Sequence, residues 1–141
     1  MGKPLIDADS IFRLVRHFHA VAGVPIADVP SQLEPARLSA RVEWLREEVN
    51  ELESAATLVD QVDAAVDVIY LALGALVEMG VELHGPLQLV HESNLTKAWP
   101  DGTFHKTAAG KIIKPRGWES PREDLNRLLH TLPQIKPRGD A

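Results

Sequence analysis

Apolar residues recur every three or four positions through the first half of the chain, which is the spacing of one face of an α-helix. This pattern predicts three helices, at about 10–22, 35–55 and 59–79. The first two are separated by a proline-rich stretch, 24–35, that is typical of a loop. No glycine or proline lies between the second and third helices, so the break expected at 56–59 rests on the need for the chain to turn back into a bundle.

The third predicted helix is apolar on almost every side over 66–77, which is typical of a buried helix. It should end at Gly80, because glycine readily adopts the left-handed conformation that closes many helices. Two shorter helices are expected at 86–98 and at 121–132.

The stretch between the two shorter helices has a different character. A turn signal at 100–102 precedes two short segments, 103–107 and 111–114, which we expect to form a small β-hairpin, with an irregular loop as the alternative. Residues 133–141 are expected to form a loose tail. The predicted fold is therefore an all-α helical bundle of four to five helices with a C-terminal loop or hairpin segment.

Composition places limits on this bundle. The 141 residues fit a single domain over 1–141, with its core at about 10–132. Hydrophobic residues make up 45% of the chain, too many for a disordered protein. The net charge of −5 argues against a nucleic-acid polymer as partner, because such binders carry a basic surface.

Cysteine content and the length of apolar runs limit the cellular environment expected for the protein. The chain contains no cysteine, which excludes disulfides and thiolate metal sites. No apolar run approaches the roughly 18 residues of a membrane span, and no signal-peptide core follows the N-terminus. A soluble cytoplasmic protein without membrane contact is therefore expected.

Two acidic clusters lie within the second and third predicted helices. They comprise Glu47, Glu48 and Glu51 in the first, and Asp60, Asp63 and Asp67 in the second. Carboxylates three or four residues apart share one helix face, and like charges at that spacing repel by about a few tenths of a kcal/mol per pair. Two such rows facing each other favour a cation between them. Mg²⁺ prefers oxygen ligands of this kind, so the pattern predicts a divalent-ion site.

Each cluster also has a structural interpretation. The glutamates can form an ordinary solvated face, and Asp60 can cap the third helix. Asp63 and Asp67 lie well inside the most hydrophobic helix, where a carboxylate must be paired, hydrogen-bonded or bound to metal. Arg46 is a candidate partner, so a structural ion pair remains open beside the favoured metal site.

These motifs resemble those of the MazG-like, all-α nucleoside triphosphate pyrophosphohydrolases, which include phosphoribosyl-ATP pyrophosphohydrolase and the dimeric dUTPases. Residues 45–52, with their Glu-x-x-Glu, are similar to the first motif of the superfamily, and 62–80 are similar to the second. The C-terminal motif of a phosphoribosyl-ATP-pyrophosphohydrolase-like branch is matched at 94–97, 101–102 and 110–115. The resemblance covers roughly residues 12–121.

One departure concerns the second motif, which is Glu-x-x-Asp in the superfamily. If Asp67 is its aspartate, Ala64 stands at the glutamate position and cannot bind metal. If Asp63 is its aspartate, Asp60 replaces the glutamate with a shorter side chain. Asp63 and Asp67 acting together are a third option. The first cluster therefore predicts metal ligands more firmly than the second.

The resemblance implies cleavage of a nucleoside triphosphate between its α and β phosphates, with Mg²⁺ as cofactor and Mn²⁺ as a substitute. The implied metal ligands are Glu48, Glu51, Asp63 and Asp67, with Asp60 as a further candidate. Glu47 would position or deprotonate the attacking water. The implied substrate-binding residues are Asn94, Lys97, Lys111, Lys114, Arg116 and His17. For each lysine an ordinary solvated side chain is an equally good interpretation.

Several other features leave alternatives open. The tryptophans Trp44, Trp99 and Trp118 can stack on a base or pack at a subunit interface. Glu78 is expected to be a surface or capping charge. The apolar third helix needs a further surface to cover it, which predicts that oligomerisation completes the bundle as a homodimer or a dimer of dimers.

The leading hypothesis is a Mg²⁺-dependent pyrophosphohydrolase of (deoxy)nucleoside triphosphates, with removal of non-standard nucleotides as one role. Hydrolysis of phosphoribosyl-ATP is an alternative that the extended C-terminal segment disfavours. A non-catalytic, metal-binding helical interaction protein is another, and Ala64 keeps it open.

Overall fold

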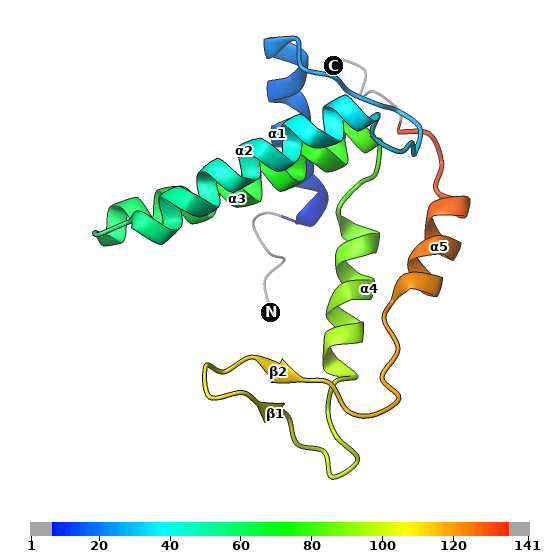
Figure 1. Cartoon of the computed structure of the whole chain (residues 1–141). Helices are drawn as coiled ribbons and strands as arrows, with labels where there is room; N and C mark the ends of the chain where they lie inside the picture. Colours follow the sequence, from blue (N-terminus) through cyan, green and yellow to red (C-terminus); the bar gives the residue numbers. More distant parts are fainter. Residues whose placement is uncertain (1–6, 136–141) are drawn as a thin grey trace. The chain divides into compact units, whose positions relative to one another are not determined.

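The computed structural model describes residues 7–135, and within this range the fold is all-α with one small two-stranded sheet (Figure 1). Its elements are α1 (Ala8–Ala22), α2 (Pro35–Ser54), α3 (Leu58–Met79), α4 (His84–Leu95), β1 (His105–Lys106), β2 (Ile112–Ile113) and α5 (Arg122–Thr131). The predicted all-α class, the five helices and the hairpin are confirmed, and the helix bounds differ from prediction by a few residues at most.

The chain divides into two compact units. One contains the residues up to Leu83 together with the segment from Pro133 onward, and the other contains His84–Leu132. The prediction of one domain over 1–141 stays a prediction. Each unit is described by itself.

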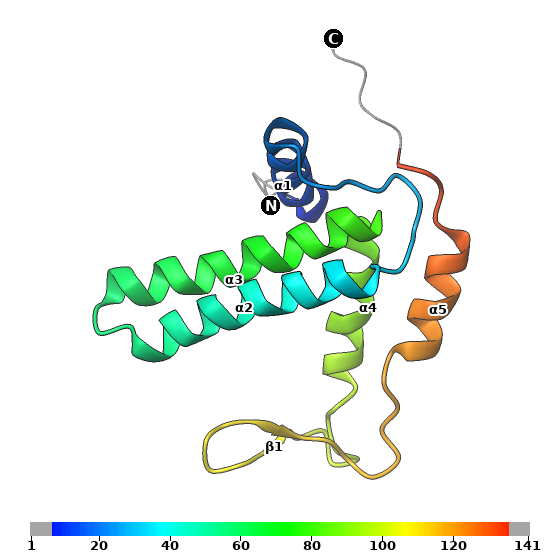
Figure 2. The same ribbon diagram turned by 45° about the horizontal axis from the view of Figure 1, so that its top comes forward.

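In the first unit, α2 and α3 lie side by side and antiparallel (Figures 1 and 2). Helix α1 packs against α3 near the end where α3 finishes. The buried apolar residues at this crossing are Phe12, Val15, Leu73 and Val77. Burial of each such side chain contributes about 1.5–3 kcal/mol, so this cluster is what holds α1 to the hairpin of α2 and α3.

The C-terminal end of α3 is closed by a glycine, as predicted. Gly80 has a left-handed backbone with φ 68°. A Cβ atom at this position would lie 2.6 Å from the carbonyl oxygen of Val29, so the loop before α2 approaches the helix end only because no side chain is present. The amides of Ala27 and Ser31 donate to the carbonyls of Val77 and Met79, which satisfies acceptors that the end of a helix leaves open.

The first residues after Pro133 are not a loose tail. The amide of Ile135 donates to the carbonyl of Asp28 at 2.7 Å, and the Ile135 side chain packs on the buried cluster. The prediction of a loose tail is therefore wrong at Ile135, because an apolar side chain that covers the core fixes the backbone beside it. The rest of that prediction, 136–141, lies outside the described residues.

The end of α2 and α3 that contains the loop between them extends beyond α1 (Figure 2). There α3 carries an apolar stripe, made of Val59, Val62, Val66 and Ile69, that this single chain leaves exposed. Val62 and Ile69, for example, are 53% and 58% exposed. The side of α3 that was expected to need covering is thus open.

In the second unit, α4 packs against α5. Gly85 permits the close approach, because a Cβ there would lie 3.0 Å from Cδ2 of Leu128. Strands β1 and β2 pair antiparallel, with His105 opposite Ile113 and Lys106 opposite Ile112. Across residues 7–135, no helix combines the length and the apolar character that crossing a membrane requires.

Candidate functional site

Four of the predicted carboxylates of α2 and α3 act electrostatically on a fifth, that of Glu48. Burial raises the pKa of the Glu48 carboxyl above its usual value, and the negative charges of Glu51, Asp67, Asp63 and Glu47 raise it further. Atom Oε2 of Glu48 is enclosed and has no hydrogen-bond partner. The two antiparallel helices therefore place Glu51, Asp63 and Asp67 near enough to Glu48 to act on its charge, and no hydrogen-bond donor among the described residues reaches its Oε2.

These side chains do not close around a common point. Within the described range, no three histidine, aspartate or glutamate side chains are arranged to hold a metal ion. The donor set still fits a hard divalent cation by its chemistry: every candidate ligand is a carboxylate, and Glu48 offers an oxygen that nothing else satisfies.

Asp60 is engaged in capping α3. The Oγ1 atom of Thr57 accepts from the Asp60 amide at 3.2 Å, and the Thr57 hydroxyl donates to Oδ2 of Asp60 at 2.6 Å. Thr57 is thus the N-cap, and Asp60 is its partner three residues on, a variant of the capping box. The expectation that Asp60 itself is the cap is wrong by three positions.

Two further residues considered with the second motif, Ala64 within it and Arg46 on α2, also have defined surroundings. Ala64 is buried, with 3% of its surface exposed, so a glutamate at this place would have to bury its carboxylate. Arg46, considered as an ion-pair partner for Asp67, pairs instead with Glu43 at 3.4 Å on the exposed side of α2. Asp63 and Asp67 remain as the α3 carboxylates that act on Glu48.

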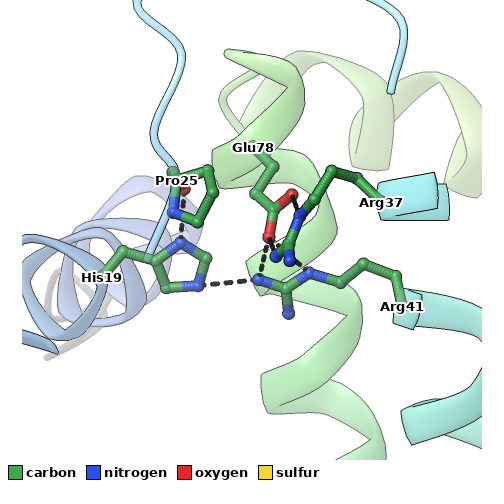
Figure 3. Close-up of polar contacts among 5 residues, drawn as sticks. All are labelled: His19, Pro25, Arg37, Arg41 and Glu78. Carbon is green, nitrogen blue, oxygen red and sulfur yellow. Dashed lines mark hydrogen bonds and ion pairs between the residues drawn. The ribbon is translucent and has the colours of Figure 1, made fainter. Parts of the chain in front are cut away.

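A second polar cluster lies in the first unit, where α1, α2 and α3 meet (Figure 3). Glu78 receives both arginines of α2. Arg37 donates through Nε at 3.0 Å and Nη2 at 2.5 Å, and Arg41 donates to Oε1 through Nε at 2.8 Å and Nη2 at 2.6 Å. The Arg41 and Glu78 side chains are 4% and 2% exposed. The expectation that Glu78 is a surface or capping charge is wrong, because its partners hold it in the interior.

His19 completes this cluster from α1. Its Nδ1 lies 2.9 Å from the carbonyl oxygen of Pro25, and its Nε2 lies 3.2 Å from Nη2 of Arg41. A carbonyl can only accept and a guanidinium can only donate, so His19 is neutral with its proton on Nδ1. Burial lowers the pKa of His19, and the charges of Arg41 and Arg37 add to that effect against the opposing effects of Pro25 and Glu78.

The arginines also determine the pKa of Glu78. Burial alone would raise the pKa of this carboxyl, but the hydrogen bonds and positive charges of Arg37 and Arg41 outweigh burial and lower it. Gly74 leaves the space that the cluster occupies: a Cβ there would lie 2.5 Å from Nη1 of Arg41. The cluster is a structural ion-pair network that ties three helices together. One sequence signal could have found it, namely a glutamate between Val77 and Met79 on an apolar helix.

The predicted substrate-binding residues fall in both units. His17 is exposed on α1. Asn94, Lys97 and Lys114 lie together in the second unit, because Lys97 donates to Oδ1 of Asn94 at 2.6 Å and both lysines sit over the ring of Trp118. Lys111 and Arg116 are exposed in the segments that flank β2.

The three tryptophans all have partners within the chain. Trp44 lies under the guanidinium groups of Arg37 and Arg41, with 5.5 and 5.2 Å between each Cζ and the ring centroid. Trp99 stacks on His105 with 3.9 Å between ring centroids. Whether any of them also stacks on a base stays a prediction.

The structure is thus an all-α fold in which two paired helices, α2 and α3, carry carboxylates that act on Glu48. Comparison with protein families gives the particular assignment. A family model described as phosphoribosyl-ATP pyrophosphohydrolase matches residues 15–94, which include both acidic clusters, and the chain belongs to this family. The resemblance to the all-α pyrophosphohydrolases is thereby confirmed, and the protein is a nucleotide pyrophosphohydrolase. No curated protein sequence matches the chain.

Proposed function

We propose that this pyrophosphohydrolase depends on Mg²⁺ and cleaves a nucleoside triphosphate between the α and β phosphates, releasing the monophosphate and pyrophosphate. The observation that carries the proposal is the Glu48 carboxylate, which is acted on by four other carboxylates and has an enclosed oxygen without a partner. Such an arrangement is unfavourable alone and becomes favourable when a cation is bound.

The residues have distinct roles in this proposal. Glu48, Glu51, Asp63 and Asp67 would hold the cation, which when bound neutralises phosphate charge and makes a coordinated water more acidic. Glu47 is exposed and contributes to the charge at Glu48, so it is the candidate that orients or deprotonates the attacking water. Mn²⁺ would substitute for Mg²⁺, since both accept oxygen ligands.

Phosphoribosyl-ATP is the second candidate substrate. The description of the family model that matches 15–94 favours it. It would be cleaved at the same bond, so the same carboxylates would serve. The expected substrate-binding roles of Asn94, Lys97, Lys111, Lys114, Arg116 and His17 stay predictions in either case.

The proposal predicts pyrophosphate release from at least one member of a nucleotide panel that includes phosphoribosyl-ATP. The protein is incubated with each compound in Mg²⁺, in Mn²⁺ and in excess chelator, and both products are identified. A monophosphate with pyrophosphate establishes α–β cleavage, whereas a diphosphate with orthophosphate contradicts it. Absence of pyrophosphate release from every compound of the panel would favour a metal-binding protein without turnover.

We also propose that the protein is a homodimer or a dimer of dimers. The apolar stripe of α3 supports this, because four large aliphatic side chains are more exposed than a stable single chain normally leaves them. We expect sedimentation at micromolar concentration to give at least a dimer and Val66→Lys, at the middle of the stripe, to shift it toward monomer. A monomeric wild-type protein would contradict the proposal.

A further inference from the structure

The second unit contains two lysines that share one aromatic ring. The ammonium nitrogens of Lys97 and Lys114 lie 5.1 and 4.7 Å from the centroid of the Trp118 ring. They come from distant parts of the unit, since Lys97 follows α4 and Lys114 follows β2. The ring is therefore the point that brings two like charges together.

Within residues 7–135, the ion pairs formed by the carboxylates do not include this pair of lysines. Among the residues that the structure describes, neither lysine forms an ion pair with a carboxylate, although the chain is acidic overall. Lys97 donates to the neutral amide oxygen of Asn94. An ammonium group has three N–H donors, so each lysine that rests on the ring keeps donors for another acceptor.

Trp118 is itself held in place. Its Nε1–H points to Oγ1 of Thr96 at 3.0 Å and to the carbonyl of Ser93 at 3.3 Å, both at the end of α4. Its backbone amide closes a turn on the carbonyl of Pro115 at 3.2 Å, with Gly117 at φ 81° in the position that requires a left-handed residue. These bonds fix the ring that the lysines rest on.

We propose that Trp118 is the positioning residue of a phosphate-binding site formed by Lys97 and Lys114. The lysines supply charge and donors to phosphate oxygens, and the indole face pre-orders two long side chains that would otherwise lose rotamer freedom on binding. Trp118 thus acts through the lysines and does not stack on the base. That the natural ligand is the phosphate chain of a nucleotide rests on the proposed function; the anion site itself does not.

The test is calorimetric titration of the full chain with inorganic tripolyphosphate in excess chelator, so that neither metal nor turnover contributes. Wild-type protein should bind, and Lys97→Met, Lys114→Met and Trp118→Leu should each weaken binding by about tenfold. Lys106→Met removes an exposed lysine of β1 in the same unit and should leave binding within about twofold. Trp118→Phe keeps an aromatic face and should retain most of the affinity for tripolyphosphate. It therefore provides a second test of the ring should Trp118→Leu fail to fold.

A double-mutant comparison separates positioning from general support of the fold. In a protein that already carries Lys97→Met and Lys114→Met, adding Trp118→Leu should cause no further loss of affinity. Three results would overturn the proposal. The wild-type protein fails to bind tripolyphosphate, or Trp118→Leu binds it with full affinity. The third is that Trp118→Phe binds tripolyphosphate at least tenfold more weakly than Lys106→Met does. Binding of tripolyphosphate without pyrophosphate release from any nucleotide would refute the proposed function alone.

Discussion

Replacing Glu48 with glutamine is expected to abolish pyrophosphate release and, in the absence of divalent ions, to raise the melting temperature. Activity should fall by at least about a hundredfold, because a charged ligand of the cation that would stabilise the reacting phosphates is lost. The gain in stability follows from the raised pKa of Glu48. A carboxyl whose folded pKa exceeds its unfolded value destabilises the fold once the pH rises through the folded pKa, and glutamine removes that charge.

The effect of divalent ions on the melting temperature should also differ between the wild-type protein and Glu48→Gln. Mg²⁺ should raise the melting temperature of the wild-type protein, since a ligand that binds only the folded state stabilises it, and Glu48→Gln should lose most of that increase. The measurements are scanning calorimetry with and without Mg²⁺ beside the pyrophosphate assay.

Glu53→Gln is the matched control for Glu48→Gln. It removes an exposed glutamate from the same helix and should leave both the activity and the response to Mg²⁺ close to wild type. A Glu48→Gln protein that keeps wild-type turnover, or that melts lower than wild type without metal, would show that this carboxylate is not part of the metal site.

The second large effect is expected at Glu78. Glu78→Gln should lower the free energy of unfolding by about 3–5 kcal/mol, because it leaves the buried guanidinium of Arg41 without a counter-charge. Urea unfolding at one fixed protein concentration measures the change. Glu43→Gln is the control, since it removes a glutamate from an exposed pair with Arg46 and should cost less than about 1 kcal/mol. Equal losses in the two variants would contradict the structural role of the network.

The same network predicts how stability depends on pH. His19 has a lowered pKa in the folded protein, so the unfolded chain binds more protons below about pH 6.5 and stability should fall as the pH decreases from there. Glu78 also has a lowered pKa and should add a further loss below its usual value of 4.5. His19→Gln should flatten the upper part of the profile, whereas exposed His17→Gln should leave it unchanged. A profile that His19→Gln leaves as steep as wild type would exclude this cause.

The sequence was most informative where the cause of structure is local. Helical spacing of apolar residues predicted α1, α2 and α3, and Gly80 was correctly predicted to end α3. Spacing along each helix also indicated which carboxylates share a face. The raised pKa of Glu48 on α2 includes contributions from Asp63 and Asp67 on α3, so these carboxylates of the two helices lie within range of each other. What the pattern could not decide was the second motif, because the burial of Ala64 depends on how α2 and α3 pack.

Features that depend on distant partners were missed. The charge of Glu78 is evident in the sequence, but its two arginines lie 41 and 37 positions away, and no local rule joins them. Ile135 was likewise assigned to a tail, because nothing near it in the sequence indicates a core formed by residues of α1 and α3. In both cases tertiary packing determined the environment of a side chain whose neighbours in sequence indicated a different one.

The space that Gly74 leaves for Arg41 links the permitted residues at two distant positions. A methyl group at 74 would collide with a guanidinium that is already fixed by Glu78 and His19. A larger residue at 74 therefore requires the Arg41 guanidinium to shift or a shorter residue at 41, and either change disturbs a partner of Glu78. In engineered libraries of this protein, positions 41, 74 and 78 should consequently be varied as one set, since a change at 74 alone meets the guanidinium that Glu78 holds in place.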